Sequence, residues 1–275
     1  MNNKVLHLEE MSWRQIDELD RDSTVFFYPI SPLEEHGPHL PVGTDYLTAR
    51  DTAEEAIKRF QSKRKARGIL YPPVPIGYSK INSDFPGTFS VSSRVVREIV
   101  YSVVTSLGEQ GFRYLVICTF HMALGHLKGI YQAMEKGRRR YGMRICEPWG
   151  PYFYSNKVLD REPKLGFDTT REVHGGFRET SLMKYQYPYL VDESYKNLQS
   201  IYRDLNSIGV YGKTFKELGL KDGYIGSPSR ADTDYGRWFF NEIVDIIVEE
   251  ACKLYDGKPV SNLPNNIRRL MKLVF

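Results

Sequence analysis

Apolar runs alternate with helical patterns along most of the chain. Four short runs rich in β-branched and aromatic residues predict strands at Val25 to Ile30, Ile69 to Val74, Tyr114 to Thr119 and Met143 to Glu147. Apolar positions with helical spacing predict helices at about Tyr46 to Gln61, Ser93 to Leu107, Gly129 to Arg140, Glu179 to Tyr185 and Tyr235 to Tyr255. This repeated alternation predicts an α/β fold with a mainly parallel sheet covered by helices on both faces.

One segment, 148–173, interrupts this alternation. It is rich in Tyr, Pro, Gly and Lys without clear periodicity, and we interpret it as a loop-rich excursion near a site. The 275 residues contain no internal repeat, so a single domain spanning 1–275 is the simplest expectation. No apolar run is long enough for a membrane span, and Met1 to Arg14 is too polar for a secretory signal. We therefore expect a cytoplasmic protein that binds no membrane.

Charge and cysteine content exclude several classes of protein. The net charge is +4, and the basic runs Lys63 to Arg67 and Lys136 to Arg140 fall at the polar ends of predicted helices. We interpret them as solvated faces and expect no nucleic-acid partner. Cys118, Cys146 and Cys252 are odd in number and widely spaced, which disfavours a disulfide framework or a cysteine zinc site. All three are predicted to be core residues.

Candidate chemistry begins directly after the first predicted strand. The segment from Glu34 to Asp45 holds two imidazoles and three carboxylates among glycines and prolines that exclude a regular helix. A turn at Gly37 and Pro38 can bring Glu34, His36 and Asp45 around one point. Ligands of parallel α/β sheets collect beyond the carboxyl ends of the strands, so this segment predicts a divalent metal site there. The alternative is a polar loop with solvated histidines.

Two further histidines have a setting that suits a site. His121 follows the strand Tyr114 to Thr119 and lies at the same end of the sheet. His174 precedes Gly175-Gly176 and a helix start at Glu179. His7 and His126 have no such setting, and we interpret them as structural residues.

These motifs resemble those of the creatininase (creatinine amidohydrolase) family. The resemblance runs from about residue 20 to residue 250, and its first motif is the most specific. The motifs that carry it, in order, are 34–45, Phe85-Pro86-Gly87-Thr88, Gly111-Phe112-Arg113 with His121, His174-Gly175-Gly176 with Glu179-Thr180-Ser181, and 223–228 leading to Gly236.

The resemblance implies a three-layer α/β/α sandwich with two divalent metal ions per chain, zinc, manganese or iron, and often a homo-oligomer, possibly a hexamer. By position, Glu34, Asp45 and His121 would bind one metal. His36, Asp45 and Glu179 would bind the other, so that Asp45 bridges the pair. Glu179 could instead cap its helix or brace a ligand.

Three more residues take roles from the same resemblance. His174 corresponds to a proton-transfer residue and is the candidate catalytic residue, with a packed structural histidine as the alternative. His39 is expected to pack beside the ligands, and Glu35 to be a surface neighbour.

Departures from the family pattern bear on the substrate. The family usually has Asn-Gly-His-Gly-Gly-Asn where this chain has Thr119 to Leu124, and the expected pocket acids are replaced by Val173 and Phe177, although Glu172 is adjacent. Where the family often shows Glu-His, this chain has Ile81-Asn82. We therefore expect a substrate other than creatinine, neutral or anionic because of Lys80. The residues predicted to line its pocket are Ser79, Lys80, Met122 and Trp149.

Three functions follow from this pattern. The first is a metal-dependent hydrolase that uses hydroxide activated by two metals on a small cyclic or linear amide. The second hydrolyses a carbon-carbon bond in a cyclic diketone such as an inositol-derived ketone. The third is a non-catalytic metal-binding member of the family, which the retained ligand set disfavours. In each case the expected partner is a small molecule.

Overall fold

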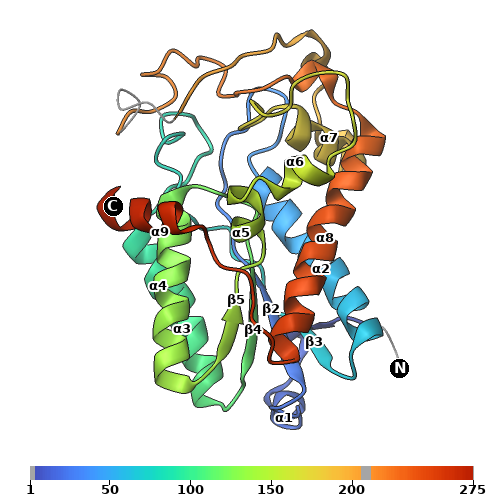
Figure 1. The fold of residues 1–275 in the computed structure, drawn as a ribbon, viewed down its shortest axis with the longest axis vertical. Helices are drawn as coiled ribbons and strands as arrows, with labels where there is room; N and C mark the ends of the chain where they lie inside the picture. The colour runs from blue at the N-terminus through green and yellow to red at the C-terminus, as the bar shows by residue number, and fades with distance from the viewer. Residues whose placement is uncertain (1–3, 206–211, 275) are drawn as a thin grey trace.

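The computed structural model describes residues 4–205 and 212–274, and within them a five-stranded parallel sheet forms the centre of the molecule (Figure 1). The strand order is β1-β3-β2-β4-β5, and every neighbouring pair is parallel. The mainly parallel sheet predicted from the sequence is confirmed. The strands are β1 (Leu6–His7), β2 (Thr24–Pro29), β3 (Arg67–Leu70), β4 (Tyr114–Cys118) and β5 (Arg144–Cys146).

Strand β2 shows why these sequences form a buried sheet. Successive side chains of a strand point to opposite faces, so an apolar run without alternation can fill both. Val25 and Phe27 belong to the hydrophobic core on one face, while Phe26 and Tyr28 belong to the core on the other. All four are fully buried. The sheet therefore separates two apolar cores, one under each helical layer.

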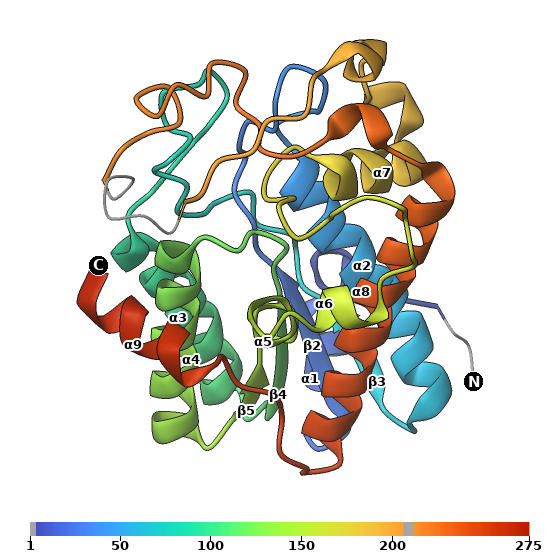
Figure 2. The same ribbon diagram turned by 45° about the horizontal axis from the view of Figure 1, so that its top comes forward.

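Helices cover both faces, which confirms the α/β/α sandwich. On one face, α2 (Thr44–Lys63), α7 (Phe177–Gln186) and α8 (Thr233–Tyr255) pack together. On the other face, α3 (Ser93–Glu109) packs along α4 (Leu124–Tyr141) (Figures 1 and 2). The remaining elements are η1 (Leu8–Glu10), α1 (Trp13–Asp17), α5 (Trp149–Tyr154), α6 (Lys157–Arg161), η2 (Pro188–Leu190), η3 (Glu193–Asn197), η5 (Pro228–Arg230) and α9 (Asn265–Val274).

Some sequence-based boundaries were wrong. The strand predicted to reach Val74 ends at Leu70, because Pro72 and Pro73 lack the N–H groups that a central ladder needs. Val74 forms only an isolated bridge with Ile30. Elsewhere, the segment 148–173, expected to be rich in loops, holds the short helices α5 and α6 between loops.

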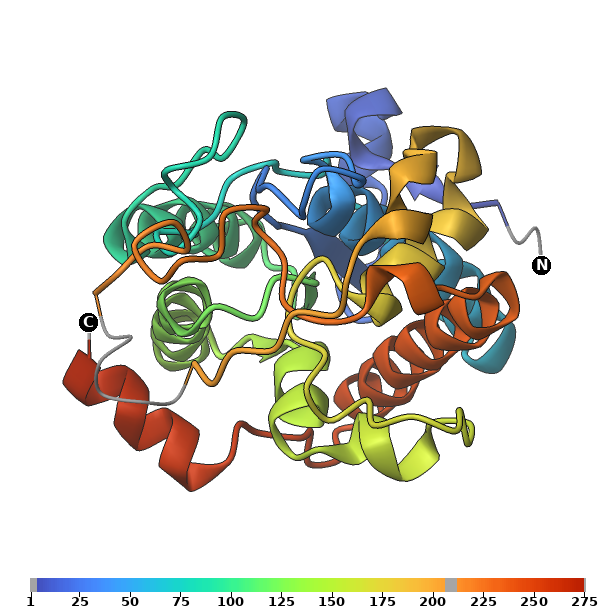
Figure 3. The ribbon, with the colours of Figure 1, turned by 90° about the horizontal axis from the view of Figure 1, so that it is seen from above.

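The two ends of the sheet differ. The long loops gather above the carboxyl ends of the strands, in the upper part of Figure 1, and are seen from above in Figure 3.

The three cysteines are buried and unpaired, as expected. No helix among the described residues is long and apolar enough to cross a membrane.

Candidate active site

The residues predicted as metal ligands come from four places at the carboxyl end of the sheet. Glu34 and His36 lie in the loop after β2, and His121 follows β4. Asp45 is in the first turn of α2 and Glu179 in the first turn of α7, where the helix dipole favours a carboxylate. The loop folds back on itself because the N–H of Glu34 donates to the carbonyl of Val42 over 2.8 Å.

A first group joins Glu34, Asp45 and His121. Ring nitrogen Nδ1 of His121 lies 2.9 Å from Oε2 of Glu34 and 2.9 Å from Oδ2 of Asp45. One N–H cannot satisfy both carboxylates, and Oε2 of Glu34 is left without a hydrogen bond among the described residues. The opposite nitrogen, Nε2–H, donates to the carbonyl of Tyr78 over 2.8 Å. This second bond holds the ring so that Nδ1 faces the carboxylates.

A second group joins His36, Asp45 and Glu179. Nε2 of His36 lies 3.3 Å from Oδ1 of Asp45 and 3.9 Å from Oε2 of Glu179. Nδ1–H of His36 donates to the carbonyl of Glu34 over 2.9 Å, so Nε2 is the nitrogen free for a ligand role. Oε2 of Glu179 also accepts the N–H of Gly175 over 2.5 Å. Asp45 therefore contributes one oxygen to each group.

Burial and charge act against each other here. Burial lowers the pKa of His121, but the carboxylates of Glu34 and Asp45 outweigh it and raise that pKa to about 10. The pKa of His36 is also raised well above its usual value, chiefly by Asp45 and Glu179 against the effect of burial. Burial raises the pKa of Glu179. Positive charge therefore stabilises the buried carboxylates, and either protons or metal cations can supply it.

The donor set fits divalent cations. Every ligand atom is an imidazole nitrogen or a carboxylate oxygen, which suits zinc, manganese and iron. Within each group the ligand atoms lie within 4.8 Å of one another, and the residues are buried or nearly so. Buried Oε2 of Glu34 and Nε2 of His36 have no hydrogen-bond partner among the described residues, as expected for atoms that bind an ion.

His174 lies beside these groups. Its backbone forms a bridge with Ile225, and Nε2–H donates to the carbonyl of Glu35 over 2.6 Å. Nδ1 faces Oε1 of Glu34 at 3.4 Å. Hydrogen bonding and charge from Glu35 and Glu34 raise the pKa of His174, although burial and His36 lower it. Gly175 must be glycine, because its φ is +57° and a Cβ there would lie 2.7 Å from the carbonyl of His36.

Two residues beside the ligand groups, Asn82 and Glu35, were not placed there by the sequence. Asn82 is fully buried, and its amide donates to Oε1 of Glu34 over 2.7 Å, although it was noted only as a departure from the family. Glu35, expected at the surface, is 6% exposed and accepts the N–H of Gly37. The loop doubles back at Gly37, which turns Glu35 inward. His39 packs nearby and bonds Thr180 over 2.7 Å, as expected.

A cavity of about 950 Å³ opens next to the ligand groups. Of the residues predicted to line a substrate pocket, Lys80, Met122 and Trp149 lie on this cavity and Ser79 does not. Its neighbours Tyr78 and Lys80 line the cavity, while the side chain of Ser79 is fully buried outside the lining. Glu172 lines the cavity too, and its Oε2 accepts the N–H groups of Phe177 and Ser227.

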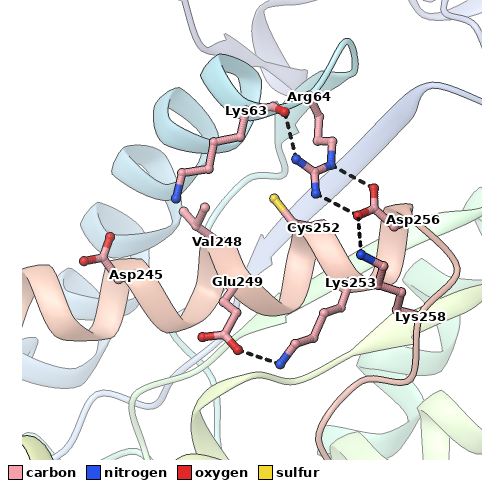
Figure 4. A pocket seen from close by; sticks show the side chains of 9 residues that line it. All are labelled: Lys63, Arg64, Asp245, Val248, Glu249, Cys252, Lys253, Asp256 and Lys258. Atoms are coloured by element: carbon pink, nitrogen blue, oxygen red, sulfur yellow. Dashed lines mark hydrogen bonds and ion pairs between the residues drawn. The ribbon is translucent and has the colours of Figure 1, made fainter.

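A second, shallower pocket of about 450 Å³ lies at the other end of α2 and carries no cluster of this kind among the described residues. Figure 4 shows Arg64 forming a two-pronged ion pair with Asp256, and Lys253 paired with Glu249. Within the basic run that begins at Lys63, the charge of Arg64 is thus neutralised by Asp256, the C-cap residue of α8.

The sequence matches a known protein family over most of its length. The sequence model of the creatininase family, described as creatinine amidohydrolase, matches residues 9–251. The chain is 35% identical over 223 residues to a mycofactocin precursor peptide peptidase of Mycolicibacterium smegmatis, a match covering 79% of this chain and 80% of that protein. It is 25% identical over 202 residues to a creatinine amidohydrolase of Pseudomonas putida, covering 69% and 75%.

A solved structure shows the same fold. A structure titled "Creatininase Mn" superposes with a TM-score of 0.71 at 21% identity, covering 93% of this chain and all of that one.

Proposed function

The chain belongs to the creatininase family of hydrolases, and we propose that it is a metal-dependent amide hydrolase with two divalent cations held by Glu34, His36, Asp45, His121 and Glu179. The observation that carries this proposal is the pair of buried ligand groups that share Asp45 beside a large cavity. When bound, such cations supply Lewis acidity, which polarises a carbonyl and makes water a better nucleophile.

The protein's own residues complete the chemistry. Hydrolysis adds the oxygen of water to the carbonyl carbon, breaks the carbon-nitrogen bond and requires a proton on the leaving nitrogen. His174 is the residue proposed to carry that proton, since its ring lies beside the ligand groups, with Nε2 2.6 Å from the carbonyl of Glu35 and Nδ1 3.4 Å from Oε1 of Glu34. Asn82 holds Glu34 in place through its amide.

The proposed substrate is larger than creatinine. Pockets for drug-sized ligands measure roughly 300–1,000 Å³, and a cavity of about 950 Å³ is near the upper end of that range. The relative at 35% identity is named as a peptide peptidase, which supports an amide bond in a peptide or peptide-like compound. Lys80 and Lys213 line the cavity without an ion-pair partner among the described residues, which favours a neutral or anionic substrate.

Elemental analysis of the purified protein tests the metal site. We expect about two equivalents of metal per chain, and loss of both in Asp45→Asn, because Asp45 belongs to both groups. Glu54→Gln is the matched control, since it removes a carboxylate from the same helix outside the site and should keep the metal. An unchanged metal content in Asp45→Asn would overturn the two-metal proposal.

A substrate panel tests the reaction. Blocked dipeptides, lactams and cyclic diketones are incubated with the metal-loaded protein, and products are followed by mass spectrometry. Cleavage of amides supports the proposal. Cleavage of diketones alone would favour the carbon-carbon hydrolase instead, and no turnover with two bound metals would favour the non-catalytic alternative.

We further propose a homo-oligomer built from a single domain, which sedimentation analysis would test. Location in the cytoplasm stays a prediction.

A further inference from the structure

Large apolar side chains converge at the mouth of the active-site cavity. Among the large hydrophobic residues that are most exposed in the described part of the chain are Phe153, Val173 and Leu270, at 36%, 44% and 41%. All three line this cavity, although they come from α5, from the loop before α7 and from α9. Exposed apolar residues from three distant segments at one opening indicate a binding surface.

Helix α9 supplies one of these three residues, Leu270. It begins at Asn265, beyond residue 251, where the match to the family ends. Buried Met271 and half-buried Ile267 fix α9 against a cluster with Leu127, Leu263 and Tyr131, and Figure 3 shows the helix alongside α4. With α9 anchored in this way, Leu270 is left to face the cavity.

The anchoring cluster and the cavity wall share residues. Met122, Leu124 and Tyr154 belong to the cluster under α9 and also line the cavity. The hydroxyl of Tyr154 donates to the carbonyl of Met122 over 2.5 Å, which ties α5 to the loop after β4. This side of the cavity is therefore a preformed apolar wall, and α9 completes its rim.

We propose that this wall is a subsite for a large apolar side chain, aromatic or aliphatic, carried by the substrate next to the bond that is cleaved. The proposal deepens the proposed function and rests on it for the position of that bond. Burial of apolar surface is its driving force, and each further buried methylene strengthens binding about fourfold. The lysines on the lining, Lys80 and Lys213, would meet the substrate's polar part instead.

Binding of two probes tests the subsite without turnover. Phenylalanine and alanine, which contain no amide bond, are titrated as free amino acids into the metal-loaded protein, and affinities are measured by saturation-transfer NMR. We expect the phenylalanine probe to bind at least about tenfold more tightly, and Leu270→Ala to reduce that ratio about threefold or more. Leu190→Ala is the matched control, because Leu190 is 37% exposed and does not line the cavity.

A second variant distinguishes a change in the subsite from a loss of folded structure. Leu270→Trp should narrow the opening and shift the preference towards the alanine probe, while circular dichroism melts show that each variant is folded. Equal affinities of the two probes, or a ratio unchanged in both Leu270 variants, would overturn the subsite even if amides are hydrolysed. If the ratio of the two affinities changes in the Leu270 variants but the protein cleaves no amide, the subsite is supported and the proposed reaction is refuted.

Discussion

Replacing Glu147 by glutamine should change how the stability of this protein depends on pH. Glu147 follows β5 and is 1% exposed. Its Oε1 accepts the N–H groups of Trp149 and Gly150, both over 2.8 Å, and its Oε2 accepts the hydroxyl of Tyr131 over 3.1 Å. The carboxylate thus holds the start of α5, the helix that carries Trp149 into the cavity wall.

The size of the effect follows from the pKa. Burial raises the pKa of Glu147 from 4.5 to about 7, although the hydrogen bonds from Gly150, Tyr131 and Trp149 act in the opposite direction. Between these two values the folded protein keeps a proton that the unfolded chain has lost, so the free energy of unfolding falls as pH rises through this window. One unit of pKa corresponds to about 1.4 kcal/mol, so the loss between pH 5 and pH 8 is about 2–3 kcal/mol.

Urea unfolding at pH 5, 6, 7 and 8, followed by circular dichroism, measures this loss. Glutamine keeps an acceptor for the two backbone N–H groups but cannot ionise, so Glu147→Gln should lose less stability than the wild type as pH rises. Other titrating groups contribute equally to both proteins and cancel in the difference between them. Parallel stability curves for the two proteins would refute the assignment of a raised pKa to Glu147.

Two further predictions concern packing and catalysis. A Cβ at Gly236 would lie 1.9 Å from the carbonyl of Ser181, so Gly236→Ala should lower the free energy of unfolding by about 3 kcal/mol. Gly142 has open space around it, and Gly142→Ala should cost only about 1 kcal/mol, because of its positive φ. Thermal melts of the two variants test this difference. His174→Gln should lower kcat by a factor of about 10²–10⁴ while the metal content stays unchanged, and a parallel loss of metal would instead identify His174 as a ligand.

The fold was largely predictable because the apolar runs of the strands and the helical spacing of apolar residues indicate the same α/β arrangement. In β2 and β4 nearly every residue is apolar, which indicates strands buried on both faces, and α3 and α8 carry apolar residues with helical spacing. The two-residue strand β1 (Leu6–His7) is too short to leave a pattern. It forms because the existing edge of β3 pairs with it, a tertiary cause that local sequence does not record.

The grouping of the candidate ligands could be predicted where several ligand-type residues are adjacent in sequence. Glu34, His36 and Asp45 fall within twelve residues, and a parallel sheet brings His121 to the same edge. Asn82 gave no such signal, because an isolated amide is common in loops and its contact with Glu34 depends on how the loop after β3 folds back. Ser79 was misassigned because the side-chain direction in an extended loop cannot be read from composition.

The candidate ligands and the cavity wall lie on different elements of the fold, which explains why the reaction class is easier to infer than the substrate. The ligand groups rest on strand ends and first helical turns, whose backbone positions are fixed by the sheet and the two cores. The cavity wall is built instead from α5, the loop before α7 and α9, segments that only meet through side-chain contacts. Changes in those segments can alter the shape of the cavity without moving Asp45 or His121. The chemistry and the choice of substrate can therefore vary independently in this fold, and α9, which lies beyond the family match, contributes Leu270 to the cavity lining.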